Sequence, residues 1–190
     1  PSCPASPEST AGPFPLDEQL VRADITEGYP GHRLRLGLRV LDGQCLPVAG
    51  AAVEIWHTDA SGDYSAFADA GSGKDEGPGT TFMRGTQQVN DDGIAEFTTI
   101  YPGWYEGRTP HIHVRVRMPD AVTFTSQLYF PDDYTAVVYQ EAPYAEFGPA
   151  DTTNATDRLA GDVATNGLLL RVDPSPTGGS RALANLAIGG

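Results

Sequence analysis

The sequence predicts an all-β protein, a β-sandwich with long loops and an extended N-terminal arm. Three observations lead to this expectation. The chain contains 22 glycines and 16 prolines, more than a helical protein usually carries. Short runs rich in Val, Ile, Thr, Tyr and Phe stand between clusters of turn residues. Apolar residues occupy alternate positions from residue 34 onward, which is the period of a half-buried strand.

The N-terminal half of the chain begins with the expected arm. Five prolines within the first 15 residues predict an extended segment over 1–32. A strand follows over 33–40 and ends at the turn Asp42-Gly43. A second strand is expected over 51–57, and a loop rich in Gly, Asp and Ser then runs over 64–79.

The remaining strands are short and separated by turn residues. They are predicted over 82–89, 94–100, 111–118 and 123–130. The stretch 136–161 is expected to hold one short helix, and 167–172 a closing strand. We therefore divide the chain into an arm, a sandwich domain and a loosely attached C-terminal tail, over 1–32, 33–173 and 174–190.

The length and the charge limit the function classes. A chain of 190 residues is one ordinary domain that can bury a core of its own. The formal net charge is −13, and Lys74 is the single lysine. Nucleic acid and anionic membrane surfaces would be repelled by this charge, so we expect neither as a partner. No run approaches the roughly 20 apolar residues that a membrane helix needs.

Cys3 and Cys45 are the two cysteines. They are compatible with one disulfide in an oxidising compartment or with two separate thiols, and the sequence does not decide between these. A disulfide is the favoured interpretation, because a thiol on a Pro- and Ser-rich arm has no core in which to hide.

The pair His111 and His113 is the first candidate for a metal site. On a strand, residues two apart project from the same face, so two imidazoles at this spacing can share one metal. A lone His-x-His pair is more often two structural histidines. The loop 101–110 directly upstream is dense in aromatic residues, which in such loops usually serve as lids or packing.

Several sequence blocks together resemble the intradiol ring-cleavage dioxygenases, in the order expected for that family. The blocks are Val53-Glu54-Ile55-Trp56-His57, Gly62-Asp63-Tyr64-Ser65, Pro102-Gly103-Trp104-Tyr105, Arg108-Thr109-Pro110-His111-Ile112-His113 and Gln127-Leu128-Tyr129-Phe130. The likeness extends from about Thr10 to Phe130. The helical dimerisation region of the intracellular catechol branch is missing, so the chain looks more like the compact, often secreted branch.

The resemblance implies a set of metal ligands. Carried over residue by residue, they are Tyr64, Tyr105, His111 and His113, with Tyr105 as the ligand that leaves when substrate arrives. The donor chemistry supports ferric iron independently, since two phenolates and a hydroxide neutralise a 3+ ion and hard anionic oxygens favour Fe(III). We therefore expect Fe(III) as the cofactor.

The resemblance also implies roles beside the metal. Arg108 is expected to stabilise negative charge that develops on the substrate ring, and Gln127 to hydrogen-bond beside it. Gly12, Pro13 and Phe14 match a family segment that folds back over the catalytic pocket, which would give the arm something to pack on. Trp104 is expected to contact substrate together with Arg108. Arg84 is expected to brace the neighbouring strand and loop.

The implied function is cleavage of catechol-type rings with O2 between the two hydroxyl-bearing carbons, through Fe(III) chelation of the catecholate, to give cis,cis-muconate-type products. The expected partners are a small aromatic diol and O2. The sequence does not indicate which catechol derivative is preferred or which oligomeric state the protein adopts. It also leaves room for a fused or partner domain beyond this sequence. The lysine-poor, acidic composition and the missing dimer region lead us to expect a secreted enzyme.

Two other readings stay open at this point. The first is another mononuclear metal enzyme that combines the His-x-His pair with His57 and a carboxylate such as Asp59 or Asp63, although His57 is better explained as a structural residue. The second is a non-catalytic β-sandwich binding module, because strand-turn-strand patterns of this kind occur in many sandwich domains.

Overall fold

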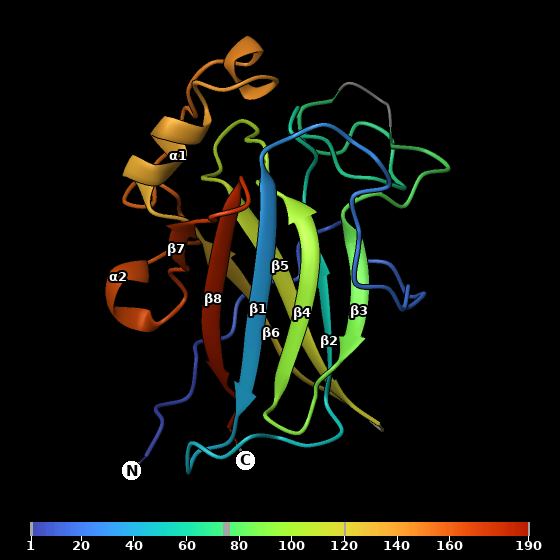
Figure 1. Cartoon of the computed structure of the whole chain (residues 1–190), viewed down its shortest axis with the longest axis vertical. Helices are drawn as coiled ribbons and strands as arrows, with labels where there is room; N and C mark the ends of the chain where they lie inside the picture. The colour runs from blue at the N-terminus through green and yellow to red at the C-terminus, as the bar shows by residue number, and fades with distance from the viewer. Residues whose placement is uncertain (1, 74–76, 120, 190) are drawn as a thin grey trace.

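The computed structural model describes residues 2–73, 77–119 and 121–189. Eight strands form two four-stranded sheets that pack face to face, which confirms the predicted β-sandwich (Figure 1). One sheet has the order β4-β1-β8-β7 and the other β3-β2-β5-β6. The strands are β1 (Arg33–Leu41), β2 (Ala52–Trp56), β3 (Arg84–Gln88), β4 (Ile94–Ile100), β5 (His111–Met118), β6 (Ala121–Tyr129), β7 (Arg171–Pro174) and β8 (Ser180–Ala187).

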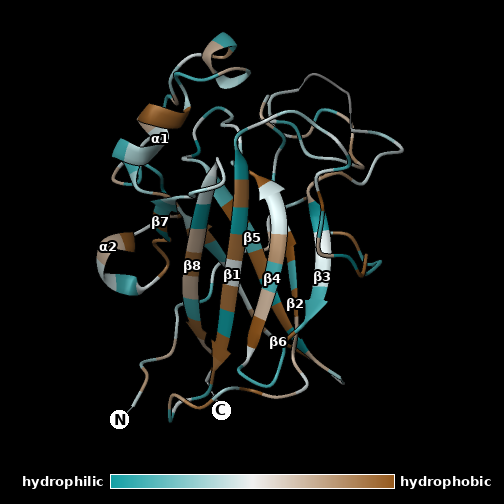
Figure 2. Cartoon of the chain, in the orientation of Figure 1, coloured by the Kyte–Doolittle hydropathy of each residue, from teal (hydrophilic) through white to brown (hydrophobic). Residues whose placement is uncertain are grey.

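The core lies between the two sheets and is built from alternate residues of each strand. Figure 2 shows this alternation as bands along β1. Its inward residues Leu34, Leu36 and Leu38 are fully buried. From the other sheet, Ile112 and Val114 of β5 join the same core cluster. Because strand neighbours point in opposite directions, His111 and His113 face away from this core, on the outer face of their sheet.

The helices are short and lie beside the sandwich (Figure 1). They are α1 (Asp132–Val138), a 3₁₀ turn (Tyr144–Glu146) and α2 (Val163–Asn166). The helix expected within 136–161 therefore begins earlier, at Asp132. No helix in the described ranges is long and apolar enough to cross a bilayer.

The predicted C-terminal tail is wrong for residues 180–187. They form β8, which pairs in parallel with β1 and antiparallel with β7. The turn between β7 and β8 is closed by hydrogen bonds from the Gly178 amide to Ser175 and from the Ser175 amide to Gly179. The pattern was hard to read because the buried face of β8 is made of small residues such as Ala182. The closing strand expected over 167–172 is also shifted, since β7 begins at Arg171.

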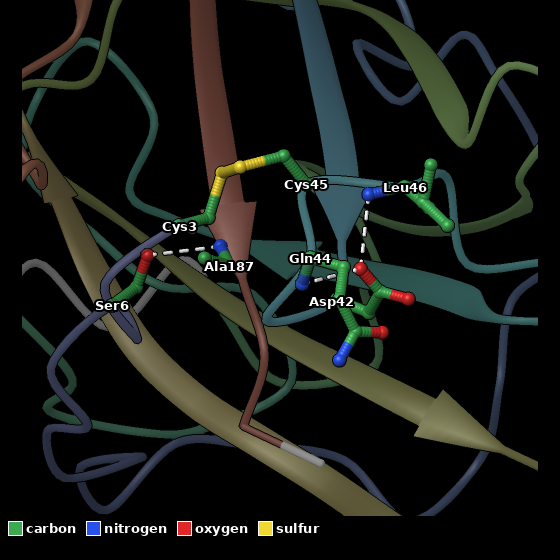
Figure 3. Close-up of a disulfide and its surroundings, with 7 residues drawn as sticks. All are labelled: Cys3, Ser6, Asp42, Gln44, Cys45, Leu46 and Ala187. Carbon is green, nitrogen blue, oxygen red and sulfur yellow. Dashed lines mark hydrogen bonds between the residues drawn. A yellow bond between two sulfur atoms is a disulfide. The ribbon is translucent and has the colours of Figure 1, made fainter. Parts of the chain in front are cut away.

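Residues 2–32, called the arm below, hold no regular helix or strand but bond to several strands. The Ser9 amide donates to Thr125 of β6 and the Ser6 amide to Ala187 of β8. Further along the arm, the Arg22 amide donates to Thr86 of β3. The arm is also joined by a Cys3–Cys45 disulfide to the turn after β1, as Figure 3 shows. Strand edges that would be open are thereby covered by the arm.

Candidate metal centre

Four side chains meet on the outer face of the sheet β3-β2-β5-β6. The Tyr64 hydroxyl lies 3.2 Å from His111 Nε2 and 3.0 Å from His113 Nε2. The Tyr105 hydroxyl lies 3.4 Å from His111 Nε2. Tyr64, His111 and His113 are almost fully buried, while Tyr105 is partly exposed. The structure therefore brings together all four residues that the sequence predicted as metal ligands.

The two tyrosines lie on two loops that pack closely against each other at Gly62. Tyr64 lies in the long segment between β2 and β3, and Tyr105 in the turn before β5. Gly62 has a φ of +91°, and a side chain there would begin 2.1 Å from the carbonyl oxygen of Trp104. Only glycine allows this approach, and it holds the two tyrosine-bearing loops side by side.

The two histidines are held in different ways. His111 Nδ1 lies 2.7 Å from the Thr109 carbonyl and donates to it, which leaves the lone pair on Nε2 facing the tyrosines. Burial lowers the pKa of His111 to about 3, with Arg108 adding to the effect. His113 stacks on Trp56 with the ring planes 2° apart, and its Nδ1 is buried with no partner among the described residues. Burial holds its pKa well below 6.5. Both imidazoles are therefore neutral and can offer a lone pair to a cation.

Burial raises the pKa of both tyrosines above 10, most strongly for Tyr64. Without a cation the two side chains are thus phenols at neutral pH. A bound cation reverses this balance, because it stabilises the phenolate. Metal binding at this site is therefore expected to release protons.

The donor set fits a ferric ion. For first-row metals with bonds of about 2.0–2.2 Å, neighbouring donor atoms lie roughly 3.0–3.5 Å apart, which is the range of the three tyrosine-to-histidine distances. Two neutral imidazoles and two phenols that can become anionic match the hard, highly charged Fe(III) ion. In the described part of the chain, no three His, Cys, Asp or Glu side chains gather as a metal site, so the tyrosines are what completes the set.

Arg108 lies beside the four donors and its guanidinium is held from two sides. Nε donates to Asp157 Oδ2 at 2.8 Å, and Nη2 donates to Gln127 Oε1. Nη1 is left facing the Tyr105 hydroxyl and His111 Nε2, each at 3.4 Å. Burial lowers the pKa of Arg108, but Tyr105 and Asp157 outweigh it and the net direction is upward. The guanidinium is thus a fixed positive charge at the edge of the site.

Asp157 is a site residue that sequence reasoning missed. Its side chain is fully buried and accepts hydrogen bonds from Arg108 Nε, from the Thr109 amide at 2.9 Å and from the Leu159 amide at 2.8 Å. These bonds and the Arg108 charge outweigh desolvation, so the pKa of Asp157 lies below its usual value. No local motif indicates this residue, because its partners at the site, Arg108 and Thr109, are almost 50 positions away in the chain.

Gln127 connects the site to the arm. Its Oε1 accepts from Arg108 and, at 3.2 Å, from the Tyr129 hydroxyl, while its Nε2 donates to the Thr10 carbonyl at 3.0 Å. Gln127 pairs with His113 across the sheet, so both side chains lie on the same outer face. The residue therefore fixes Arg108 and the arm with one amide group.

A cleft of about 1150 Å³ opens next to the four donors. Gly12, Pro13 and Phe14 line it together with Tyr105 and Arg108, and the same cleft is lined by Thr10, Gly71, Glu106, Gly107, His113, Gln127, Thr156, Arg158 and Leu159. A side chain at Gly12 would start 3.2 Å from the His113 ring, so the arm passes close over the site. The arm thus forms one wall of the cleft.

Trp104 is not among the residues that line this cleft, and its contact with substrate stays a prediction. Its indole Nε1 donates to the Gly148 carbonyl at 3.1 Å, and its ring packs against the main core. The neighbouring Tyr105 faces the metal site, and the residue next to it in an extended segment points elsewhere.

The alternative metal set that includes His57 is not assembled. His57 is fully buried, and its ring nitrogens lie 2.7 Å from the Thr58 carbonyl and 2.8 Å from the Thr99 hydroxyl. Asp59 accepts from Ser61 and from the Asp63 amide, and so stabilises its own turn. His57 is therefore a structural residue, as the sequence indicated.

Arg84 braces the loop that carries Tyr64. Its guanidinium donates to the Ser65 hydroxyl at 2.7 Å, to the Ser65 carbonyl at 2.8 Å and to the Phe14 carbonyl at 2.7 Å. One side chain thus fixes the Tyr64 loop and the arm to β3, in agreement with its predicted bracing role.

Comparison with known proteins identifies the family. A family model described as a dioxygenase matches residues 5–163. Chlorocatechol 1,2-dioxygenase of Rhodococcus opacus is 30% identical over 123 residues, which cover 55% of this chain and 46% of that protein. The protocatechuate 3,4-dioxygenase beta chain of Burkholderia cepacia is 32% identical over 130 residues, which cover 63% and 54%. The chain spans about half the length of the curated relatives that it matches.

The fold points to the same family along nearly the whole chain. The intradiol ring-cleavage dioxygenase from Tetranychus urticae superposes with a TM-score of 0.88 at 33% identity, covering 98% of this chain and 95% of that one. The match of the dioxygenase model to most of the chain and this similarity agree with the sequence blocks around the four donors. The chain therefore belongs to the intradiol ring-cleavage dioxygenase family.

Proposed function

We propose that this protein is an iron(III)-dependent dioxygenase that opens catechol-type rings with O2 between the two hydroxyl-bearing carbons, giving cis,cis-muconate-type products. The observation that carries the proposal is the convergence of Tyr64, Tyr105, His111 and His113 beside Arg108, at the edge of a cleft. The relatives named above include chlorocatechol and protocatechuate dioxygenases, which supports a catechol-type substrate.

The residues of the site would share the work as follows. Tyr64, Tyr105, His111 and His113 would hold the ion. When bound, Fe(III) supplies a Lewis acid that makes the hydroxyls of a coordinated diol acidic near neutral pH. Tyr105 is the more exposed tyrosine and has Arg108 Nη1 next to its oxygen. Its phenolate would therefore be placed to take up a proton from the entering diol, and the resulting hydroxyl would lie against the guanidinium.

Arg108 would stabilise negative charge that develops on the substrate ring. Its orientation is set in advance by Asp157 and Gln127, so little reorganisation is needed during the reaction. The arm and Phe14 would keep water away from the face of the site that they cover.

A visible spectrum of the purified protein tests the proposal. Tyrosinate bound to Fe(III) is expected to give a red-brown charge-transfer band that shifts when catechol is added under nitrogen. Admission of air is then expected to yield a muconate, detected by ultraviolet absorbance and mass spectrometry. A protein that stays colourless and unresponsive after ferric reconstitution would contradict the proposal.

We further propose that the protein works outside the cytoplasm. The Cys3–Cys45 pair supports this, because disulfides persist mainly in oxidising compartments. Thiol titration of the native protein in denaturant is expected to find no free thiol before reduction and two after it. Recovery of the native protein from a cytosolic fraction with both thiols reduced would count against this location.

A further inference from the structure

The cleft beside the metal centre is larger than a bare catechol needs. Its volume of about 1150 Å³ exceeds the roughly 300–1000 Å³ typical of pockets that enclose drug-sized ligands. A single ring with two hydroxyls fills a small part of it. The remaining space is therefore available to a substituent on the ring, and the walls around that space determine which substituent fits.

One wall of this space is formed by Arg158 and Leu159. Both side chains are exposed and line the cleft. Their backbone is fixed by Asp157, which accepts from the Leu159 amide with one oxygen and from Arg108 with the other. The residue that orients Arg108 at the metal centre thus also sets the position of Arg158 and Leu159.

Arg158 is the cationic side chain of the cleft that is available to bind a ligand. Among the described lining residues the charged side chains are Arg108, Arg158 and Glu106. Arg108 is bound to Asp157 and Gln127, whereas Arg158 forms no ion pair or side-chain hydrogen bond with any residue that the structure describes. Glu106 lies on the opposite turn next to Gly107, whose amide donates to the Asp151 carboxylate.

The overall charge of −13 does not prevent an anion from binding here. At physiological ionic strength, charges more than about 8 Å away are largely screened. Two guanidiniums and one carboxylate line the cleft, so its local charge is positive although the whole chain is acidic. Leu159 beside it offers an apolar surface, and its side chain is one of the few large hydrophobic ones left exposed, at 37%.

We propose that Arg158 and Leu159 select catechols that carry a short apolar side chain ending in a carboxylate. Leu159 contacts the apolar linker, and the Arg158 guanidinium binds the terminal carboxylate with its planar donor groups. This assignment rests on the proposed function, because it takes the diol end of the molecule to lie at the four donors.

The test compares an acid with its neutral ester. The probes are 3-(3,4-dihydroxyphenyl)propanoate and its methyl ester, which differ in charge but not in the ring or the linker. Their affinities for the iron-loaded protein are measured by calorimetry under nitrogen, and their kcat/KM values in air. The variants are Arg158→Gln and Arg158→Glu, with Arg181→Gln as the matched control, since Arg181 is exposed on β8 of the other sheet.

The wild type and Arg181→Gln are expected to prefer the acid over the ester by about tenfold, as one charge-assisted hydrogen-bonded pair provides. Arg158→Gln is expected to remove this preference, mainly through KM, and Arg158→Glu to invert it. An acid-to-ester ratio near one in the wild type, or a ratio unchanged by Arg158→Glu, would overturn the inference while catechol turnover persists. A preference for dopamine over the acid would assign selection to Glu106 instead and also overturn it. If no catechol binds at all, the proposed function itself fails.

Discussion

Tyr105 and His111 lie among polar partners, whereas Tyr64 and His113 lie among aromatic rings. On the polar side, Thr109, Asp157 and Gln127 direct His111 and Arg108 through hydrogen bonds. On the aromatic side, Tyr64 packs on Phe14 with ring centroids 4.9 Å apart, and His113 stacks on Trp56 at 5.0 Å. The two halves of one donor set are thus held by different forces.

The difference separates two tasks. Hydrogen bonds direct individual lone pairs and charges, so the polar half controls protonation and charge at the site. Ring packing fixes the positions of side chains and excludes water, but it does not orient charges. The aromatic half therefore keeps Tyr64 and His113 in place and their surroundings apolar. Variants in the polar half should therefore change chemistry more than stability, and those in the aromatic half the reverse, except where a donor atom itself is removed.

Removal of the Tyr64 hydroxyl should have the largest effect. Tyr64→Phe keeps the ring packing on Phe14 but deletes a donor, so iron affinity is expected to fall by more than about 100-fold, beyond the loss seen for residues that only orient ligands. Metal analysis after dialysis and the visible spectrum measure this. Tyr29→Phe is the control, because Tyr29 packs on Phe82 and not in the donor set. Full iron retention in Tyr64→Phe would break the assignment of ligands.

The second prediction tests the polar half, where Asp157 orients Arg108. Asp157→Asn removes the charge that holds Arg108, and kcat is expected to fall roughly 10–100-fold while iron content stays near that of the wild type. Single-turnover kinetics and metal analysis separate the two quantities. Asp151→Asn serves as a control in the same segment, since Asp151 is exposed and accepts from the Gly107 amide at 3.3 Å and from the Thr152 hydroxyl at 2.7 Å, but not from Arg108. Equal kcat values for the two variants would contradict a positioning role for Asp157.

The third prediction concerns Arg84, which adds hydrogen bonds to the ring packing around Tyr64. Arg84→Lys cannot reproduce the three bonds to Ser65 and Phe14, and the free energy of unfolding is expected to drop by about 2–3 kcal/mol. Urea denaturation measures this drop. Arg181→Lys on the outer face of the other sheet should change it by less than about 0.5 kcal/mol. A large loss of kcat without a loss of stability in Arg84→Lys would contradict the division of tasks between the two halves.

The smallest expected effect concerns His57 and the way the free energy of unfolding depends on pH. Burial lowers the pKa of His57 to about 4, while in the unfolded chain it lies near 6.5. Between these values the unfolded chain binds more protons, so His57 makes the metal-free protein less stable as the pH falls from about 6.5 to 4. In His57→Gln this contribution is absent. Urea curves at several pH values are expected to converge for wild type and variant toward pH 4, and parallel curves would argue against a neutral, buried His57.

Much of the fold was predictable because half-buried strands alternate visibly. The strands at 33–41 and 111–118 were expected within a residue or two. β8 was missed because alanines on its buried face give little contrast with their neighbours. Its parallel pairing with β1, more than 140 positions away, leaves no local trace.

The candidate site was predictable only through the resemblance to a family. From the residues alone, His111 and His113 indicated a shared face but not its companions. Strand register decides those companions, since it places Arg84, Trp56, His113 and Gln127 in one row across the sheet. Register depends on turns and packing along the whole chain, and Asp157 reaches the site from an irregular segment, so neither could be read in advance.

The arm has a consequence for the order in which the molecule is assembled. Thr10 accepts from Gln127, 117 positions later, and Ser6 bonds to Ala187, 181 positions later. During synthesis the arm therefore leaves the ribosome before β6 and β8, to which it binds. Until then Gly12 does not cover the His113 ring, and the donors stay open on that side. Under the proposed function, a metal ion would thus have its widest route to the site in a chain whose sandwich is complete but whose arm has not yet docked.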